Sequence, residues 1–308
     1  MKKGRRVGLI KDNLQLITLA LPAIALLAVF SYWPMFGLIM AFKDFKVPLG
    51  ILGSPWVEPI TKNFDFFLKS IDAFRVTRNT LLLNALFIAV STACAVIFAL
   101  VMYEIRKAWH IKTYQTIAII PSFVSWVAVG YIVYALLDPS KGMVNSIIKA
   151  LGAEPVNWYN EYRMWPLILL SAKVWQGVGL SSIIYYAALV GIDTEYFEAA
   201  EVDGASRLRR VWHISLPQIT PVIIIMTILA IGGIFRADFG LFYNVTRDVG
   251  ALYPTTDVID TYIFRALIKQ GNVGMASAVS MIQSIVCFVT LSAANFIVRK
   301  RSPENALF

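Results

Sequence analysis

The chain has 308 residues, of which 58% are hydrophobic and 15% are charged, whereas a soluble domain carries about 25% charged residues. The charged residues lie between long apolar runs, which is the pattern of a chain that is solvated by lipid. The formal net charge is +9, but the basic residues cluster at the ends of apolar runs and form no amphipathic stripe, so we expect no nucleic-acid binding.

Six apolar stretches are long enough for a helix to cross the ~30 Å hydrocarbon core of a bilayer. In chain order they cover residues 14–42, 80–103, 114–137, 165–190, 219–235 and 275–298. Pro121 predicts a kink in the third stretch, and the fifth is short and begins beside Pro221. The basic N-terminus followed by an apolar run resembles a signal peptide, but the run is too long and has no clear cleavage site, so we expect an uncleaved first span.

These stretches predict an all-α, polytopic membrane protein with six transmembrane helices. Both ends of the chain carry basic clusters, and an even number of spans places both ends on one side, so we expect both termini in the cytoplasm. We expect residues 1–74 to hold a cytoplasmic tail, the first span and the first extracytoplasmic loop. Residues 75–298 would form a five-helix core with a cytoplasmic loop at 193–218, and residues 299–308 a cytoplasmic tail.

The expected outer connections, at about residues 43–79, 138–164 and 236–274, are rich in Trp, Tyr and Phe. These aromatic residues fit either the interfacial belt of a membrane protein or contacts with a ligand or a docking protein. Within the last connection, residues 256–270 predict a surface helix. The chain's cysteines and histidines show no zinc-site spacing, and we expect no metal.

The loop at residues 193–218 predicts two short helices. Asp193 or Thr194 can cap the first, whose N-terminal turn suits Glu195 and Glu198, and Gly204 is placed to end it.

Ser206 can cap the second short helix, in which Leu208, Val211 and Trp212 share one face. Pro217 is expected to stop this helix before the next span. Two short helices with an apolar face are not stable alone in water, so they must lie against the membrane surface or in a groove of a partner protein.

Seven residues of this loop stand at a fixed spacing that is similar to the EAA signature of the permeases of ATP-binding-cassette (ABC) importers, Glu-Ala-Ala-x3-Gly-x9-Ile-x-Leu-Pro. They are Glu198, Ala199, Ala200, Gly204, Ile214, Leu216 and Pro217. The resemblance implies a type I ABC importer permease fold, in which this loop couples to an ATPase subunit. Glu198 would then pair with a basic group of that subunit, and Gly204 would make the turn. An amphipathic loop on the membrane surface is the alternative.

Further segments, at residues 30–37, 41–44, 78–80, 235–243 and 274–277, resemble the carbohydrate-uptake branch of these permeases, and in particular those for oligosaccharides from complex polysaccharides. The resemblance implies several partners: a second homologous permease subunit, two ABC ATPase subunits and an extracytoplasmic sugar-binding protein. The chain contains no Gly-Lys dipeptide and therefore no phosphate-binding loop of the Gly-x4-Gly-Lys type. We expect ATP and Mg²⁺ on the partner ATPase, and no catalysis or cofactor in this chain.

A sugar path needs hydrogen-bonding groups and flat apolar faces inside the bilayer, where polar residues are costly and usually face the bundle interior. Lys173 could instead snorkel to the interface, Arg236 and Asp238 could form an interfacial ion pair, and Asn84, Gln283 and Asn295 could join helices. The candidates for the path are Trp126, Tyr131, Lys173, Trp175, Gln176, Tyr185, Arg236 and Asp238.

The sequence therefore predicts a non-catalytic permease subunit in the cell membrane, which moves an oligosaccharide by alternating access. A secondary transporter that works without an ATPase is the alternative, although no Asp or Glu lies deep within the six spans to couple an ion. A membrane enzyme would need a catalytic cluster, and no such motif is present in the sequence.

Overall fold

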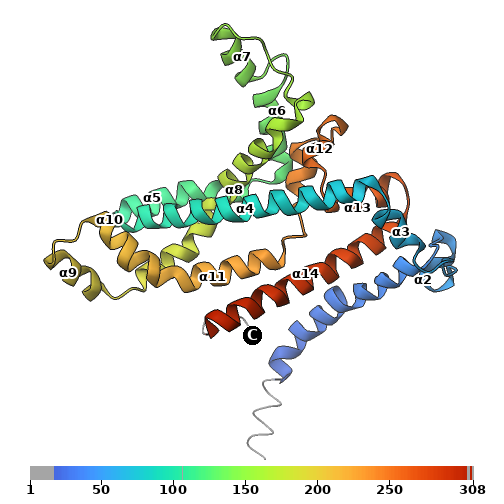
Figure 1. Cartoon of the computed structure of the whole chain (residues 1–308), viewed down its shortest axis with the longest axis horizontal. Helices are drawn as coiled ribbons and strands as arrows, with labels where there is room; N and C mark the ends of the chain where they lie inside the picture. The colour runs from blue at the N-terminus through green and yellow to red at the C-terminus, as the bar shows by residue number, and fades with distance from the viewer. Residues whose placement is uncertain (1–16, 106, 304–305, 307–308) are drawn as a thin grey trace, which may run out of the picture. The chain divides into compact units, whose positions relative to one another are not determined.

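The structure is a computed structural model that describes residues 17–105, 107–303 and 306 (Figure 1). These residues form helices joined by short connections, and within them the only β pairing is an isolated bridge between Lys43 and Trp56. The chain divides into two compact units. The small unit comprises Met1–Leu68 with Ala266–Met281, and the large unit comprises Lys69–Arg265 with Ile282–Phe308.

The elements of the small unit come from both of its segments. Residues Ile17–Phe42 are helical and are followed by α2 (Gly50–Gly53) and α3 (Lys62–Leu68). Lys43, which follows the first helix, is buried, and its Nζ donates to the carbonyls of Leu52 (2.9 Å) and Ser54 (3.0 Å) in and after α2.

The large unit holds most of the helices. They are α4 (Ile71–Tyr103), α5 (Ala108–Ile119), η4 (Ile120–Phe123), α6 (Trp126–Leu137), α7 (Met143–Ala150), η5 (Trp158–Asn160), η6 (Tyr162–Met164), α8 (Trp165–Val190), α9 (Thr194–Val202), α10 (Arg207–Arg210), η7 (Val211–Ser215), α11 (Leu216–Gly232), η8 (Leu241–Val245), η9 (Gly250–Leu252), α12 (Tyr253–Thr256) and α13 (Ile259–Phe264). Two elements, η10 (Arg265–Lys269) and α14 (Val273–Arg301), contribute residues to both units.

Five helices of the described chain are long and apolar enough to span a membrane, and a bent helix pair makes up to six. They match the six predicted stretches, with shifted ends. The second begins at Ile71 rather than at residue 80, because the Ser70 hydroxyl caps α4 by accepting from the Ala73 N–H (3.1 Å). Residues 14–16 of the first stretch lie outside the described residues.

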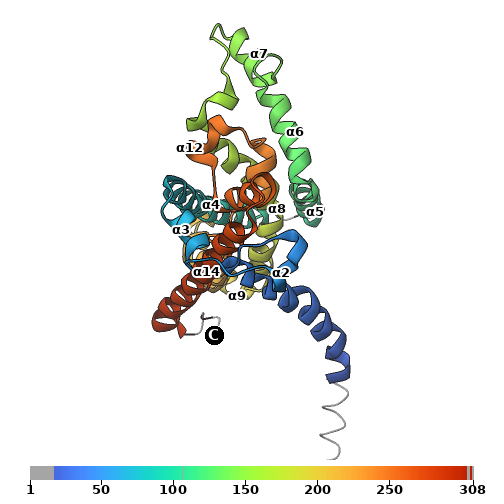
Figure 2. The same ribbon diagram turned by 90° about the vertical axis from the view of Figure 1, so that its right-hand side faces the viewer.

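The third predicted span is not one straight helix with a kink at Pro121. Instead α5 and η4 end at Phe123, α6 begins at Trp126, and the two parts meet at 95°. Ser125 makes the break stable, since its hydroxyl caps α6 by accepting from the Ala128 N–H (3.3 Å). Figure 2 shows α6 carrying α7 away from α4 and α8.

The core of the large unit lies where α4 packs along α8 (Figure 1). One end of this contact is filled by Phe87, Trp165 and Phe242, and the other by Tyr185 and Ile219 with the small residues of α4. The small side chains let the helix backbones approach closely, which is the usual way that helices associate in a bilayer.

Residues 256–270 form a helix from Ile259 to Lys269, in which α13 continues into the π-helical turn η10, but it is not the surface helix that the sequence predicts. Val258, Ile259 and Tyr262 are buried. The backbone N–H of Ile259 donates to the Thr80 hydroxyl on α4 (3.0 Å), so this segment packs against the core of the large unit.

Candidate functional site

Of the two short helices that the sequence predicts between α8 and α11, α9 is a separate short helix, whereas α10 is the first turn of a longer helix that includes α11. The carboxylate of Asp193 caps α9 by accepting from the Glu195 N–H (3.0 Å). Gly204 follows α9 with φ +74, a left-handed conformation that favours glycine, and its N–H donates to the Glu201 carbonyl (3.1 Å). The Ser206 hydroxyl then caps α10 by accepting from the Arg209 N–H (3.4 Å).

Most of α9 is open to solvent. Among its residues none is buried, and the carboxylate of Glu198 is exposed. Two contacts attach α9: the ring of Phe197 lies 5.7 Å, between centroids, from that of Tyr103 at the end of α4, and Glu201 pairs with Arg210 of α10 (3.2 Å). The other residues of the EAA pattern are also accessible, since Ala199, Gly204 and Pro217 are exposed and Ala200, Ile214 and Leu216 are half-buried. We call residues 193–217 the connecting segment.

Pro217 does not end the second helix, as the sequence had suggested. The helix runs from Arg207 to Gly232 and passes through the π-helical turn η7, in which the Leu216 N–H donates to the Val211 carbonyl. Pro217 sits in the first turn of α11, at the junction with η7, where a missing N–H costs little.

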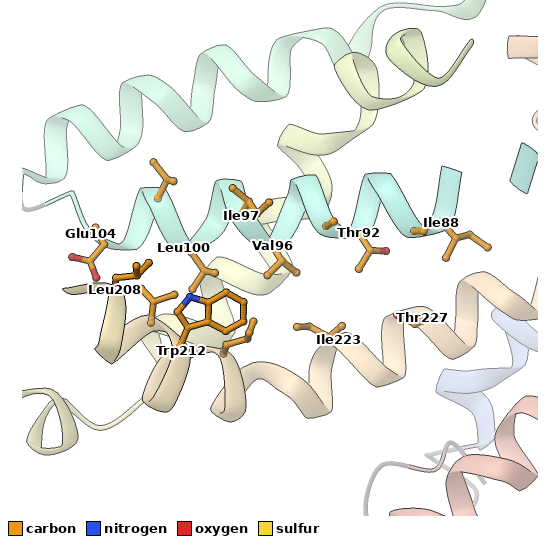
Figure 3. A pocket seen from close by; sticks show the side chains of 15 residues that line it. Ile88, Thr92, Val96, Ile97, Leu100, Glu104, Leu208, Trp212, Ile223 and Thr227 are labelled. Carbon is orange, nitrogen blue, oxygen red and sulfur yellow. The ribbon is translucent and has the colours of Figure 1, made fainter. Parts of the chain in front are cut away.

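An apolar groove of about 660 Å³ lies beside the connecting segment, between α4 and the helix that begins at Arg207 (Figure 3). The predicted shared face of Leu208, Val211 and Trp212 is confirmed, because all three line this groove. Trp212 is 60% exposed and points into the groove opposite Leu100 of α4. One wall of the groove is therefore the connecting segment with α11, and the other is the core helix α4.

A second cavity, of about 520 Å³, lies in the large unit and is lined by α4, α8, α11 and the residues that follow α11. Its lining is largely apolar but includes several charged and polar side chains, and we call it the polar cavity. Four of the predicted path residues line it: Lys173, Tyr185, Arg236 and Asp238. Lys173 Nζ lies 2.8 Å from Asp238 Oδ2, and Trp126 Nε1 donates to the same oxygen at 3.0 Å. Lys173 also lies 5.5 Å from the centre of the Trp126 ring, so three elements meet at one carboxylate.

Arg236 is not the partner of Asp238, so the predicted interfacial ion pair is wrong. Across the described residues the Arg236 side chain makes no ion pair or hydrogen bond, and it is exposed at the cavity. Its guanidinium borders the cavity and interacts electrostatically with the carboxylate of Asp260, whereas the ammonium of Lys173 is paired with Asp238.

The remaining predicted path residues lie elsewhere. Gln176 Nε2 donates to the Val124 carbonyl (2.9 Å) and so holds the break between η4 and α6. Trp175 is 48% exposed and lines none of the described cavities, and Tyr131 borders a separate recess with Tyr243.

Buried amides secure the backbone that follows α11. Asn84 Nδ2 donates to the carbonyls of Ile234 (2.7 Å) and Arg236 (3.0 Å), and Gln283 Nε2 donates to the Phe235 carbonyl (2.7 Å). Asn84 and Gln283 therefore join α4 and α14 to this loop, rather than joining two helices directly as the sequence had suggested.

Sequence reasoning missed Asp260, which completes the same support. Its carboxylate accepts from the Ala237 N–H (2.7 Å) and from Gln283 Nε2 (3.0 Å). Burial raises the pKa of Asp260, although these two hydrogen bonds act in the opposite direction. No sequence motif marks Asp260, because its role depends on contacts between distant segments.

The chain matches a known protein family over almost its whole length. Residues 1–303 match the family described as "Binding-protein-dependent transport system inner membrane component". The chain is 35% identical over 308 residues to the polygalacturonan/rhamnogalacturonan transport system permease protein YteP of Bacillus subtilis (strain 168), covering 99% of this chain and 94% of that one. It is 33% identical over 299 residues to the protein LplB of the same organism, with 96% and 92% covered.

Two solved structures share this fold. A chain of a bacterial ABC transporter involved in the import of the acidic polysaccharide alginate has a TM-score of 0.86 and 30% identity, over 97% of this chain and 99% of that one. A second structure, of a bacterial alginate ABC transporter in complex with an alginate pentasaccharide-bound periplasmic protein, has a TM-score of 0.84 and 30% identity, with 95% and 96% covered. The predicted six-helix ABC importer permease fold is confirmed.

Proposed function

The chain belongs to the family of inner-membrane components of binding-protein-dependent transport systems, and from this premise we propose that it is the permease subunit of an ATP-driven oligosaccharide importer. It would work in the cell membrane with a second homologous permease subunit, two ABC ATPase subunits that bind ATP and Mg²⁺, and an extracytoplasmic sugar-binding protein. Both termini and the connecting segment would face the cytoplasm.

One observation carries this proposal: the connecting segment presents the EAA pattern on a helix that the rest of the chain leaves exposed. The helix α9 has nine residues, too few to be stable alone in water, and none of them is buried. A groove of a partner protein would supply the missing contacts. Glu198, at an exposed position of α9, is placed to meet a basic group of that partner.

The connection to the core provides a route for motion. Phe197 contacts Tyr103 at the end of α4, and Glu104 lies 4.0 Å from Arg207 of α10. Closure of the ATPase dimer would pull on the connecting segment, which is continuous with α11 and flanks α4. The polar cavity lies between α4, α8 and α11, so a shift of these helices would change its access. Alternating access requires that ATP bind one of two such states more tightly.

The sugar substrate is supported by the relatives and by the cavity. YteP is named as a permease for polygalacturonan and rhamnogalacturonan, and the similar solved structures come from an importer of alginate. Sugar hydroxyls need hydrogen-bonding groups, and the polar cavity offers Lys173, Arg236 and Asp238 within one enclosure.

The proposal is tested with the assembled complex reconstituted in liposomes, by measuring sugar-stimulated ATP hydrolysis and uptake. We expect Glu198→Ala to lower both by more than about tenfold, because truncating one partner of a desolvated charge pair costs roughly 2–5 kcal/mol. Glu195→Ala is the matched control, since Glu195 is an exposed carboxylate one turn earlier on α9. If the chain transports sugar without any ATPase and regardless of Glu198, a secondary transporter replaces this proposal.

A further inference from the structure

A second recess lies in the large unit, apart from the polar cavity. It is bordered by α6, by η8 and by the turn after η8, and its volume is about 180 Å³. This is below the roughly 300 Å³ of the smallest sites for drug-sized ligands, so the recess suits a single ring-sized group. The lining residues are Val127, Gly130, Tyr131, Tyr243, Asn244 and Arg247.

Two tyrosine rings flank this recess. Tyr131 on α6 is 66% exposed, although it is large and half apolar. Tyr243 on η8 is fixed from behind, where its ring stacks on Phe239 at 5.0 Å and meets the edge of Phe264 at 4.9 Å. A tyrosine presents an apolar face with a polar tip, which suits a sugar ring with its C–H faces and hydroxyls.

The charged member of the recess is Arg247. Its guanidinium carbon lies 4.1 Å from the centre of the Tyr134 ring, so one face of the group is stacked on an aromatic ring. In the part of the chain that the structure describes, the Arg247 side chain makes no hydrogen bond and no ion pair, and the residue is exposed. Stacking leaves the N–H edge of the guanidinium open, and two parallel N–H groups on that edge match a carboxylate.

The backbone beneath Arg247 is held in a costly conformation. Arg247 and Asp248 have φ values of 55° and 51°, in the left-handed region, which costs a residue other than glycine roughly 1–2 kcal/mol. The Asp248 carboxylate holds the turn by accepting from the Tyr253 hydroxyl (3.0 Å) and from Arg265 Nη1 (3.1 Å). Such over-determined strain is typical of ligand-binding positions, and here it presents Arg247 at the recess.

We propose that this recess, which we call the Tyr131–Arg247 recess, binds one uronate residue of an acidic oligosaccharide. The inference rests on the proposed function and specifies its substrate class. Arg247 pairs with the carboxylate of the uronate, while Tyr131 and Tyr243 contact its ring. A neutral hexose offers no paired acceptors to the guanidinium, so the recess favours acidic over neutral sugars.

The test compares trigalacturonate with its fully methyl-esterified form, in which each carboxylate is an uncharged methyl ester. Uptake of both is measured in liposomes with the complete complex and one sugar-binding protein, for the native permease and for Arg247→Gln. The same binding protein is present in both complexes and only the permease changes. Its selectivity therefore cancels when the half-saturating concentration of the variant is divided by that of the native permease. Arg163→Gln is the matched control, since Arg163 is another arginine placed over a tyrosine ring, that of Tyr162 at 5.9 Å, and it lies outside the recess.

We expect Arg247→Gln to raise the half-saturating concentration of trigalacturonate by about tenfold, which corresponds to ~1.4 kcal/mol, and to leave the esterified probe unchanged. Tyr131→Ala should weaken uptake of both probes, whereas Arg163→Gln should affect neither. Equal losses for both probes in Arg247→Gln, or no loss for either, overturns the uronate assignment. If the complex transports both probes and Arg247→Gln changes neither, this inference alone is refuted. If the native complex transports no oligosaccharide, the proposed function is refuted.

Discussion

At the scale of single residues, the carboxylate of Asp238 joins three elements, because it receives the ammonium of Lys173 and the indole N–H of Trp126. The Lys173 and Asp238 side chains are each about one-third exposed, at 33% and 32%. Their coupling should therefore exceed the small value of a fully exposed ion pair and stay below that of a buried one.

We expect a double-mutant cycle of Lys173→Met and Asp238→Asn to give a coupling free energy of about 1 kcal/mol. The measurement is the free energy of unfolding of the purified chain in mixed micelles titrated with a denaturing detergent. The control cycle uses Lys46 and Asp44, which lie 3.9 Å apart with 56% and 63% of their side chains exposed, and should show no measurable coupling. Equal coupling free energies in the two cycles would contradict the conclusion that the Lys173–Asp238 pair stabilises the fold.

Asp260 should make stability depend on pH. Burial raises its pKa above the unfolded-state value of about 3.9, so the unfolded chain releases this proton first as the pH rises. The stabilising contribution is complete below about pH 3.9 and is lost as the pH rises through the folded-state pKa. The Tm of the native protein should therefore fall as the pH rises through this window. The Asp260→Asn protein, whose amide does not titrate, should lack this part of the fall.

The Asn variant keeps an acceptor for the Ala237 N–H, so it separates the charge of Asp260 from its hydrogen bonds. Asp260→Ala removes both hydrogen bonds and should cost ~1–3 kcal/mol of stability at neutral pH. Thermal unfolding of the three proteins over a pH series is the measurement. If native and Asp260→Asn proteins show parallel profiles, the buried carboxylate does not titrate in this window.

At the scale of elements, the contact between α5 and α8 depends on a glycine. A Cβ atom on Gly179 would lie 1.9 Å from the Ala118 carbonyl oxygen, whereas a Cβ on Gly177 of the same helix would meet no atom within 4 Å. We expect Gly179→Ala to destabilise the chain by about 1–3 kcal/mol through overpacking. Gly177→Ala should be neutral or stabilising, because alanine favours helix more than glycine. Unfolding in denaturing detergent compares the two variants, and equal effects would exclude this close contact.

The sequence predicted those elements that depend on local chemistry. The apolar runs marked the spans, and Asp193, Gly204 and Ser206 marked the caps and the turn, because each acts on neighbouring residues of its own helix. The same reasoning failed at Pro217, because it treated the proline as a stop, and a π-helical turn absorbs it instead. It also failed at the 95° bend, where Gln176 of α8 holds the Val124 carbonyl across a long sequence separation.

The candidate sites divide in the same way. Arg236 and Asp238 are two residues apart and suggested a pair, but the loop after α11 turns Asp238 toward Lys173 on α8. The Tyr131–Arg247 recess needs α6 and η8 side by side, which no local pattern indicates. The EAA spacing could be recognised because it lies within one continuous segment.

At the scale of the whole molecule, much of the chain's apolar surface needs the bilayer or partner chains. In all five single-helix candidate spans of the described chain no more than 28% of the apolar window is buried, and in Ile17–Phe42 none is. Lipid can cover such surfaces, because it solvates apolar side chains as well as a protein core does. The hydrocarbon core does not suit α9, which combines exposed carboxylates such as Glu195 and Glu198 with the exposed Val202, so its cover is either the membrane surface or the partner groove that we propose.

This difference leads to a prediction for the assembled complex. Two segments of the large unit are short, helical and exposed: α9–α10 and α7, whose Met143 and Ile147 are 56% and 53% exposed. Short helices of this kind open readily, so their amide hydrogens should exchange quickly in the permease pair without its ATPase. Adding the ATPase subunits should slow exchange across residues 194–215 by at least about tenfold, because a groove that binds the helices must be vacated before they open.

The helix α7 provides the internal control, since Figure 1 shows it at the far end of α6 from the bundle, away from α9 and α10. Its exchange should not change when the ATPase is added. Glu198→Ala should return the exchange of residues 194–215 toward its rate without ATPase, while Glu195→Ala should not. If α7 and the connecting segment were protected equally, the ATPase would be acting by stabilising the whole chain. The connecting segment would then not be its docking site.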